Sequence, residues 1–430
     1  MDRVVTLDGA DTSDGSAEHP WRTLQHAANT VPVGGTVWLR SGSYVGFTMT
    51  RSGNPGMPIV FAGWPGDARP VVDGAFGARI DVVKFSAVHD VRIQGLTIRG
   101  AAGGSFSGSG LRVENGSARV EIRDDLITEN QGFGVIADTS TEVLVVDNEI
   151  SHNAAGVYLS HAGAGTIVRD NRIHHTDRML RNTIIPTNDD AGGDAIVLHK
   201  TTGATLITGN LVWGNRALSY DYGWDGGAYS IYGASNTTII GNVAWDNENV
   251  METGTDSGLP CDNNRFLRNV STGFPTAGRS LGMFLRCATN MLIAHNTFQG
   301  LLFGFSLGSD SPTYSGKTDG MRIVNNIVDL GSGKPYGVVT DLPATVVINY
   351  NLVHGTSVVA TWPGGSTTSL AMFTAMTGYE QQGRWGDPAF VSAEDLHLTA
   401  DSPAVDLGMV LPGVNDGWTG AGPDAGAYER

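Results

Sequence analysis

One short unit recurs along this chain and constrains its fold more than any other feature. It consists of an apolar alternation, an Asn, an apolar pair and a loop into a second strand, as in VLVVDNEISHN from Val143. A pivot position recurs in one register, with Asp in the first copy and Asn in the later ones: Asp125, Asn148, Asn171, Asn210, Asn242, Asn269, Asn296, Asn326 and Asn351. Scattered Asn-rich turns would not keep this register.

The spacing of the pivots predicts the architecture. The first pivots, Asp125 and Asn148, are 23 residues apart, and a period of this size with strand alternation fits one coil of a β-helix. Each coil would stack on the next at roughly 4.8 Å. A stacked Asn at an interior turn can hydrogen-bond its neighbours above and below, which satisfies polar groups that would otherwise be buried and unpaired. We therefore predict an all-β fold, a single-stranded parallel β-helix.

The two ends of the chain predict caps on this β-helix. The segment from Pro20 to Ala28 has helical character, and a helix there would cover the exposed strand edge of the first coil. The last part of the sequence reads as an irregular cap. We predict one domain over residues 1–430, with an N-terminal cap at 1–45, coils at 46–370 and a C-terminal cap at 371–430.

Composition excludes some partners. The 430 residues carry a formal net charge of −16, and an acidic surface repels nucleic acid and anionic membranes. No apolar stretch of about 18 residues is present, so we predict no membrane span. The start MDRVVTLDGADTSDG has no apolar signal core, which fits a cytosolic protein or a mature form whose secretion signal was removed. We expect a monomer.

Both ends resemble a known group of enzymes. The opening DGADTSDGSAEHPWRTLQHAANTVPVGGTVWLRSGSYVG resembles the start of many secreted right-handed parallel β-helix carbohydrate-active enzymes of the pectate-lyase-like superfamily, and the closing DPAF, LHLTADSPAVDLG and AGAYE resemble their C-terminal cap. The resemblance implies a right-handed coil, a polysaccharide or oligosaccharide substrate and secretion. It favours the mature, extracellular form.

The regular repeat is interrupted by two long insertions. Pivots Asn171 and Asn210 are 39 residues apart, and Asn210 and Asn242 are 32 apart. Loops of this kind often carry function. The insertions and the next coil gather acids and aromatic rings, and rings stack on sugars while carboxylates bind hydroxyls. The candidates for substrate binding are Tyr220, Tyr222, Trp224, Tyr229, Tyr232 and Lys200. A solvated acidic loop is the alternative.

Strand alternation assigns faces near the insertions. By the register of GVYLS, Ile196 and Leu198 point inward and His199 points outward, with Tyr232 and Arg286 in the same outward column. We place Glu252 at this column or one residue from it. Burying an unpaired carboxylate would be costly, which favours an outward Glu252.

The two cysteines occupy equivalent places on adjacent coils. Cys261 precedes its pivot, Asn269, by eight residues, and Cys287 precedes Asn296 by nine. They should lie within reach of a disulfide, which would fit an oxidising compartment. A pair of free buried thiols is the alternative.

Three function classes remain open, and a glycoside hydrolase is preferred. Hydrolases need two carboxyl groups about 5 Å or about 6.5–9.5 Å apart, and neighbouring coils can supply either separation. The candidate pair comes from Asp194, Asp225 and Glu252, with Glu252 as general acid or base and Asp225 as its partner. His199 and Arg286 complete the catalytic candidates. No cofactor is required for this chemistry.

The first alternative is a uronate lyase that works by β-elimination. The segments GGDAIVLHK and YGWDGGAYSIYG are similar to the calcium-binding coils of family 9 pectate lyases, which would place Ca²⁺ at Asp194, Asp221 and Asp225. That family's catalytic Lys is absent, because Glu252 stands in its setting. The second alternative is a non-catalytic carbohydrate-binding surface protein.

Overall fold

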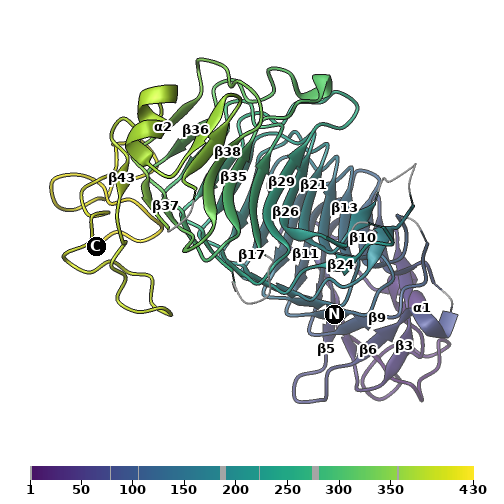
Figure 1. The fold of residues 1–430 in the computed structure, drawn as a ribbon. Coiled ribbons are helices and arrows are strands. Elements are labelled where there is room, and N and C mark those ends of the chain that lie inside the picture. The colour runs from purple at the N-terminus through teal and green to yellow at the C-terminus, as the bar shows by residue number, and fades with distance from the viewer. Residues whose placement is uncertain are drawn as a thin grey trace. The chain divides into compact units, whose positions relative to one another are not determined.

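The computed structural model describes residues 2–77, 79–104, 106–184, 190–221, 223–273, 280–355 and 358–430. The chain divides into two compact units, the first formed by residues 1–206 and 214–226 and the second by 207–213 and 227–430. Both units are stacks of coils, and each coil contributes strands to three sheets, which we call A, B and C in both units (Figure 1). The predicted parallel β-helix is confirmed.

In the first unit the strands of each sheet pair in parallel with the equivalent strand of the next coil. Sheet A contains β1 (Arg3–Val5), β2 (Thr36–Leu39), β5 (Ile59–Gly63), β8 (His89–Gln94), β11 (Ala118–Arg123), β14 (Thr141–Val146) and β17 (Thr166–Arg169). Sheet B contains β3 (Ser43–Val45), β6 (Val71–Asp73), β9 (Thr97–Arg99), β12 (Leu126–Thr128), β15 (Glu149–Ser151) and β18 (Arg172–His174). Sheet C contains β4 (Phe47–Met49), β7 (Asp81–Ser86), β10 (Ser109–Glu114), β13 (Phe133–Asp138), β16 (Ala155–Ser160) and β21 (Asp194–His199).

The second unit repeats this arrangement, and β22 (Thr205–Thr208) contains the boundary between the units. Sheet A contains β27 (Thr237–Ile240), β30 (Arg265–Leu267), β33 (Leu292–Ala294), β36 (Arg322–Val324) and β39 (Val347–Asn349). Sheet B contains β23 (Leu211–Trp213), β28 (Val243–Trp245), β31 (Val270–Thr272), β34 (Thr297–Gln299), β37 (Ile327–Asp329), β40 (Leu352–His354) and β43 (Arg384–Trp385). Sheet C contains β26 (Gly227–Tyr232), β29 (Asn249–Gly254), β32 (Leu281–Leu285), β35 (Phe303–Leu307), β38 (Lys334–Val338), β41 (Ala360–Trp362) and the antiparallel β42 (Gly365–Thr367).

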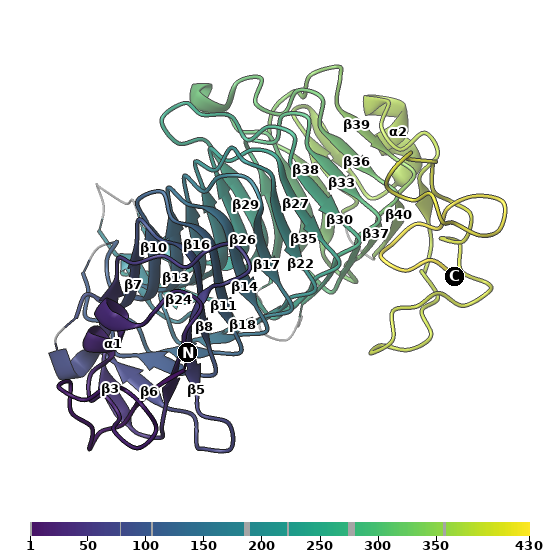
Figure 2. The same cartoon turned by 180° about the vertical axis from the view of Figure 1, so that it is seen from behind.

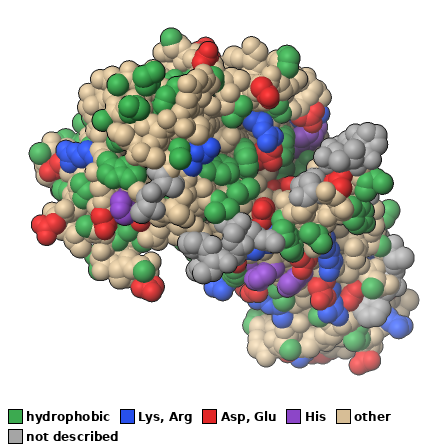
Figure 3. Space-filling view, viewed as in Figure 1, with side chains coloured by type: hydrophobic (Ala, Val, Ile, Leu, Met, Phe, Trp, Pro, Cys, Tyr) green, Lys and Arg blue, Asp and Glu red, His purple; other side chains and the backbone are tan. Residues whose placement is uncertain are grey.

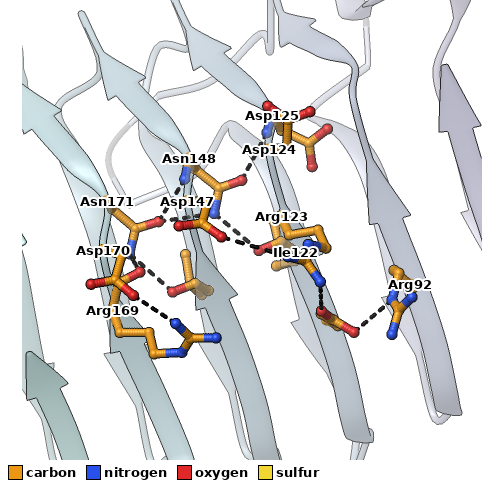
Figure 4. A network of polar contacts seen from close by, with 12 residues as sticks. Arg92, Ile122, Arg123, Asp124, Asp125, Asp147, Asn148, Arg169, Asp170 and Asn171 are labelled. Carbon is orange, nitrogen blue, oxygen red and sulfur yellow. Dashed lines mark hydrogen bonds and ion pairs between the residues drawn. The ribbon is translucent and has the colours of Figure 1, made fainter. Parts of the chain in front are cut away.

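The pivot residues form hydrogen-bonded ladders inside both units. In the first unit, the Asp125 backbone N–H donates to Asn148 Oδ1 at 3.0 Å, and Asn148 N–H donates to Asn171 Oδ1 at 3.0 Å (Figure 4). The Asn148 side-chain amide also donates to Ile122 O at 2.9 Å. These bonds satisfy the buried turns between sheets A and B, as the repeat predicted.

The ladder of the second unit runs through the remaining pivots. Each backbone N–H donates to the side-chain oxygen of the next pivot at 2.8–2.9 Å, in the order Asn210, Asn242, Asn269, Asn296, Asn326 and Asn351. All six side chains are buried. The last rung is not an Asn, because the Asn351 side-chain amide donates to Glu380 Oε1 at 2.7 Å.

A helix caps the first unit, as predicted. Helix α1 (Leu24–Thr30) begins after Thr23, whose hydroxyl accepts a hydrogen bond from the His26 backbone N–H. It buries Leu24, Ala27 and Ala28 and lies against β4 (Figure 2). The coils start earlier than the predicted boundary, because β1, β2 and β3 lie within residues 1–45 and already pair with later strands. A short 3₁₀ helix, η1 (Gly74–Gly77), follows β6.

The C-terminal segment of the second unit covers sheets A and B from outside. Helix α2 (Leu370–Thr377) begins after Ser369 and ends at Gly378, whose φ of 78° suits glycine. Beyond it, Leu411 packs on Leu267 and its neighbours, and Leu396 packs on Val270. These contacts cover residues of sheets A and B in the second unit, and neither cluster includes a residue of sheet C. No helix among the described residues has the length and apolarity needed to cross a membrane.

Candidate functional site

The outward face of sheet C in the second unit carries a charged pair. On β29, Met251 and Thr253 are fully buried, while the Glu252 side chain between them points outward and is 22% exposed. Glu252 Oε1 lies 2.5 Å from Arg286 Nη1, just after β32. The outward orientation predicted for Glu252 is confirmed. A charge-assisted hydrogen bond of this length holds the carboxylate in one position above the sheet.

Aromatic side chains surround this pair. Phe284, in register with Glu252 on the next coil, lies with its ring centroid 5.5 Å from the Arg286 guanidinium carbon. The Tyr232 ring lies where a Cβ on Gly254 would project, 2.8 Å from its nearest ring carbon, so this glycine is needed for the close approach. The register places Gly254 opposite Tyr232 and Glu252 opposite Ser230. Glu252 is therefore two residues before the Tyr232 column, rather than at it or one residue away as predicted.

Tyr314 joins the pair from a loop that sequence reasoning did not single out. It ends the short 3₁₀ helix η3 (Pro312–Tyr314), which lies between β35 and β36. Burial raises the pKa of the Tyr314 hydroxyl, with a smaller lowering by Arg286 and a smaller increase from Glu252. Its hydroxyl is 3.5 Å from the position of a Cβ on Gly254. The second unit thus brings a carboxylate, a guanidinium and two phenols together, which we call the Glu252 cluster: Glu252, Arg286, Tyr232, Tyr314 and Phe284.

Figure 3 shows the same face in space-filling form. An apolar patch with Lys or Arg side chains beside it lies over β29, β35 and β38. A surface of this kind can stack against sugar rings and hold charged or hydroxyl substituents at its margins.

In the first unit, each of the two insertions forms a short antiparallel ribbon. Strand β19 (Met179–Arg181) pairs with β20 (Ala191–Gly192), and β24 (Ala217–Leu218) pairs with β25 (Trp224–Asp225). The ribbons meet at Gly193 and Gly226, where a Cβ on Gly226 would come within 2.4 Å of the Gly193 carbonyl oxygen. Only glycine allows this backbone contact, since Gly226 also has a φ of 108°.

The acidic residues of the insertions divide into structural and exposed ones. Asp190 accepts hydrogen bonds from the Thr183 backbone and hydroxyl and from the Ser219 hydroxyl, and these bonds outweigh burial and lower the pKa of Asp190. Asp221 accepts from Ser219 at 3.1 Å and is exposed. Asp190 therefore joins the two insertions, while Asp221 lies at the surface.

The remaining predicted residues of the first unit lie on β21 and on the second ribbon. Tyr220 is 73% exposed and Trp224 is 38% exposed, so both rings are open to a ligand. Asp225 is opposite Ala217 in its ribbon. Asp194 begins β21 and Lys200 follows its last residue, and both are half-buried.

His199 faces outward, while Ile196 and Leu198 of the same strand are fully buried, as predicted. Its ring centroid is 5.9 Å from that of Tyr158 and 5.9 Å from that of His161. Sequence reasoning missed His161 and its neighbours, because the coil that contains them has no insertion.

These neighbours add polar groups to the surroundings of His199. The Ser160 hydroxyl lies 3.0 Å from His161 Nδ1, and Asp138 Oδ1 lies 3.5 Å from the same nitrogen. Ser160 is in register with Asp138 and His199 on the neighbouring coils. Asp138, Ser160 and His199 each end a strand of sheet C at the same position of the repeat, and this recurring position in the sequence could have identified the group.

One predicted role needs correction. Tyr229 is fully buried, with its ring 5.7 Å from Phe266, so it belongs to the core and cannot bind substrate. Strand alternation explains this, because Tyr229 lies three residues before the outward Tyr232 and therefore faces inward. Tyr222 lies outside the described residues.

The predicted disulfide is absent from the structure. Cys261 and Cys287 are both buried free thiols, the alternative that the sequence left open. Their positions on adjacent coils were predicted correctly, since the Cys287 thiol interacts with the Cys261 thiol and raises its pKa. Cys261 Sγ also donates to Gly254 O at 3.0 Å, beside the Glu252 cluster.

The ligand set of the calcium alternative is not assembled. Among the residues that the structure describes, no group of three or more His, Cys, Asp or Glu side chains is placed to hold a metal ion. Asp194, Asp221 and Asp225 are all within this described part. The calcium site at these three carboxylates stays a prediction.

Comparison with known proteins agrees with this architecture. Residues 81–244 match the family model for a right handed beta helix region. A relative from Bacillus subtilis (strain 168), the uncharacterized protein YwoF, is 24% identical over 93% of this chain and 91% of its own length.

Solved structures with the same fold include carbohydrate-acting proteins. XylC in complex with xylose has a TM-score of 0.58 at 11% identity, over 90% of this chain and 87% of its own. Pectate lyase Pel9A has a TM-score of 0.55 at 16% identity, over 100% of this chain and 96% of its own. The family 136 lacto-N-biosidase from Eubacterium ramulus has a TM-score of 0.51 at 11% identity, over 89% of this chain and 67% of its own. At such identities the likeness establishes the fold.

Proposed function

We propose that this protein is an extracellular enzyme that cleaves a polysaccharide at the outward face of sheet C. The observation that carries the proposal is the Glu252–Arg286 pair, held at 2.5 Å among aromatic rings on the face that the C-terminal segment leaves uncovered. A fixed carboxylate beside stacking surfaces supplies one of the two carboxyl groups that glycoside hydrolysis requires. The carbohydrate-acting neighbours of the same fold support this class of substrate.

Glycoside hydrolysis is the preferred reaction. Glu252 acts as general acid or base, and Arg286 positions its carboxylate. Hydrolysis also needs a second carboxylate, for which the sequence offers Asp225 and Asp194 as candidates. The exposed rings of Tyr220 and Trp224 are proposed to bind sugars, and Lys200 and Tyr232 to contact substituents.

One observation favours β-elimination as the second candidate. Arg286 would face a substrate carboxylate, and the Tyr314 hydroxyl, whose pKa Arg286 lowers in part, would exchange a proton with the sugar. In this version Arg286 stabilises the enolate-like charge and no Lys is required. A bound Ca²⁺ belongs to this candidate alone.

The substitution Glu252→Gln tests the proposal. We expect a loss in kcat of about a hundredfold to ten-thousandfold with glycan binding retained. Glu114→Gln is the matched control, since Glu114 lies on the outward face of sheet C in the first unit and is also ion-paired, at 2.6 Å from Lys84. Unchanged turnover in Glu252→Gln would remove Glu252 from the mechanism.

The products separate the two reactions. Neutral and uronic polysaccharides are incubated with the protein, with and without EDTA, while reducing ends and the ultraviolet absorbance of unsaturated sugars are recorded. Reducing ends without absorbance support hydrolysis, and absorbance that appears with the reducing ends supports elimination. Binding without either product would support a non-catalytic carbohydrate-binding protein.

A further inference from the structure

A hollow of about 330 Å³ opens on the outward face of sheet C in the second unit. Its walls come from four successive strands, β32, β35, β38 and β41. The residues that matter for its chemistry are Phe284, Phe303, Ser306, Lys334, Gly337 and Thr361. None of the residues that line it is acidic.

Lys334 is the charged group of this hollow. Its ammonium donates a hydrogen bond to Thr361 Oγ1 at 3.2 Å and lies 3.4 Å from the position of a Cβ on Gly337. The absent side chain at Gly337 therefore lets the ammonium lie directly over the sheet. Within the described part of the chain, no carboxylate lies at ion-pair distance from Lys334, whereas Lys84 on the same sheet face is paired with Glu114.

This arrangement is unusual in a chain whose formal net charge is −16. An ammonium with spare hydrogen-bond donors and no acidic partner is complementary to an anionic group on a ligand. The aromatic wall beside it fits the rest of a sugar, because Phe284 and Phe303 are half-buried and meet edge to face at 5.0 Å. A ring face and a cation in one hollow suit a sugar that carries a carboxylate.

The hollow and the Glu252 cluster lie along one line on the sheet. The register runs from Glu252 to Phe284, then to Ser306 and then to Gly337, one coil at a time. Three interstrand steps correspond to roughly 14 Å along the stack. A polysaccharide that lies across the coils can therefore touch both places with different sugars of one chain.

We propose that this hollow is a subsite for a uronate residue of an anionic polysaccharide. Lys334 and Thr361 bind the carboxylate, and the Phe284 ring lies against the sugar. The proposal rests on the proposed function for the placement of the cleaved bond, since the strand of Lys334 lies three coils from that of Glu252. It names the substrate class, and it holds for hydrolysis and for elimination alike.

Binding is measured on the Glu252→Gln protein, so that turnover does not interfere. The probes are polygalacturonate, alginate and hyaluronate, each in native form and with its carboxyl groups methyl-esterified, in affinity gel electrophoresis with titration of the polymer. We expect at least one native polymer to retard the protein, with the affinity weakened by added salt and by esterification. Retardation by none of the three, or equal retardation by native and esterified forms, would overturn the proposal.

A substitution then assigns the binding to the hollow. Lys334→Met should weaken binding of the retarding polymer by about tenfold or more, because it removes a charge-assisted hydrogen bond. Lys84→Met is the matched control, with the same loss of charge on the same sheet face, and should bind like the parent. Lys334→Arg keeps the charge and should retain most of the affinity. Equal binding by Lys334→Met and the parent would refute the subsite.

This result is independent of catalysis. If Glu252→Gln remains active while Lys334→Met loses binding, the proposed catalytic role fails and the uronate subsite stands. If Glu252→Gln is inactive and Lys334→Met binds normally, the subsite fails and the catalytic role stands. Thermal unfolding of each variant, compared with the parent, checks that the fold is intact.

Discussion

Glu380 ends the asparagine ladder of the second unit, and its replacement by Gln tests how a buried acid is accommodated there. Glu380 Oε1 accepts hydrogen bonds from the Tyr336 hydroxyl at 2.5 Å and from the Asn351 side-chain amide at 2.7 Å. The side chain is 2% exposed. Burial raises the pKa of Glu380 from 4.5 to about 7, although the bonds from Tyr336 and Asn351 lower it in part.

The raised pKa makes stability depend on pH. Between pH 4.5 and about 7 the folded protein keeps the Glu380 proton, whereas the unfolded chain releases it. The contribution to the free energy of unfolding is therefore fully present below pH 4.5 and is lost as the pH rises through about 7. At roughly 1.4 kcal/mol per pH unit, this interval corresponds to about 3 kcal/mol.

Glu380→Gln should remove this dependence. The amide oxygen of Gln can keep the bonds from Tyr336 and Asn351, and the new amide group does not titrate. Urea unfolding is measured at intervals from pH 4 to pH 8 for the parent, for Glu380→Gln and for the exposed control Glu394→Gln. The parent and the control should lose about 3 kcal/mol more than Glu380→Gln across this range. If the three proteins keep constant differences in stability, the raised pKa is refuted.

Two further substitutions and a thiol titration test the core. Asp125 Oδ2 is buried without a hydrogen-bond partner among the described residues, and burial raises the pKa of this carboxyl. In Asp125→Asn the new side-chain amide can donate to Ile93 O, so the free energy of unfolding at pH 7 should rise by about 1 kcal/mol. A less stable variant would contradict this. Tyr229→Phe removes a buried hydroxyl that has no hydrogen-bond partner among the described residues, so activity and glycan binding should not change. A loss of binding would show that Tyr229 does contact the substrate. Thiol titration should find Cys261 and Cys287 reactive only after unfolding, and absence of both thiols in unfolded, unreduced protein would show that they form a disulfide.

Local pattern was enough for the faces of individual strands. A strand exposes alternate residues to opposite sides, so the inward Ile196 and Leu198 and the outward Glu252 could be read from neighbouring residues. The same rule places Tyr229 inward, and assigning it to the substrate on its residue type alone was the error. Aromatic character by itself does not distinguish a core ring from a binding ring.

The surroundings of the Glu252 cluster could not be predicted in this way. Tyr314 comes close to Gly254 from a loop between later strands, and no local spacing relates the two. Lys334 was visible as one of few lysines, but the hollow around it depends on Phe284, Ser306 and Thr361 from three other coils. Contacts of this kind depend on how the coils are stacked and on where each loop ends.

The sequence alone determined the coil, because the pivot Asn and the strand alternation are imposed by hydrogen bonding and burial within one repeat and recur in every copy. It also determined the capping helix, whose apolar face must cover a strand edge. Tertiary structure decided what lies at the ends and on the faces of the stack. Glu380 completes a ladder from outside the repeat. Lys334 lies beside Thr361 and has no acidic partner within the described chain. The surroundings of these two side chains depend on residues that folding brings together from distant positions in the sequence.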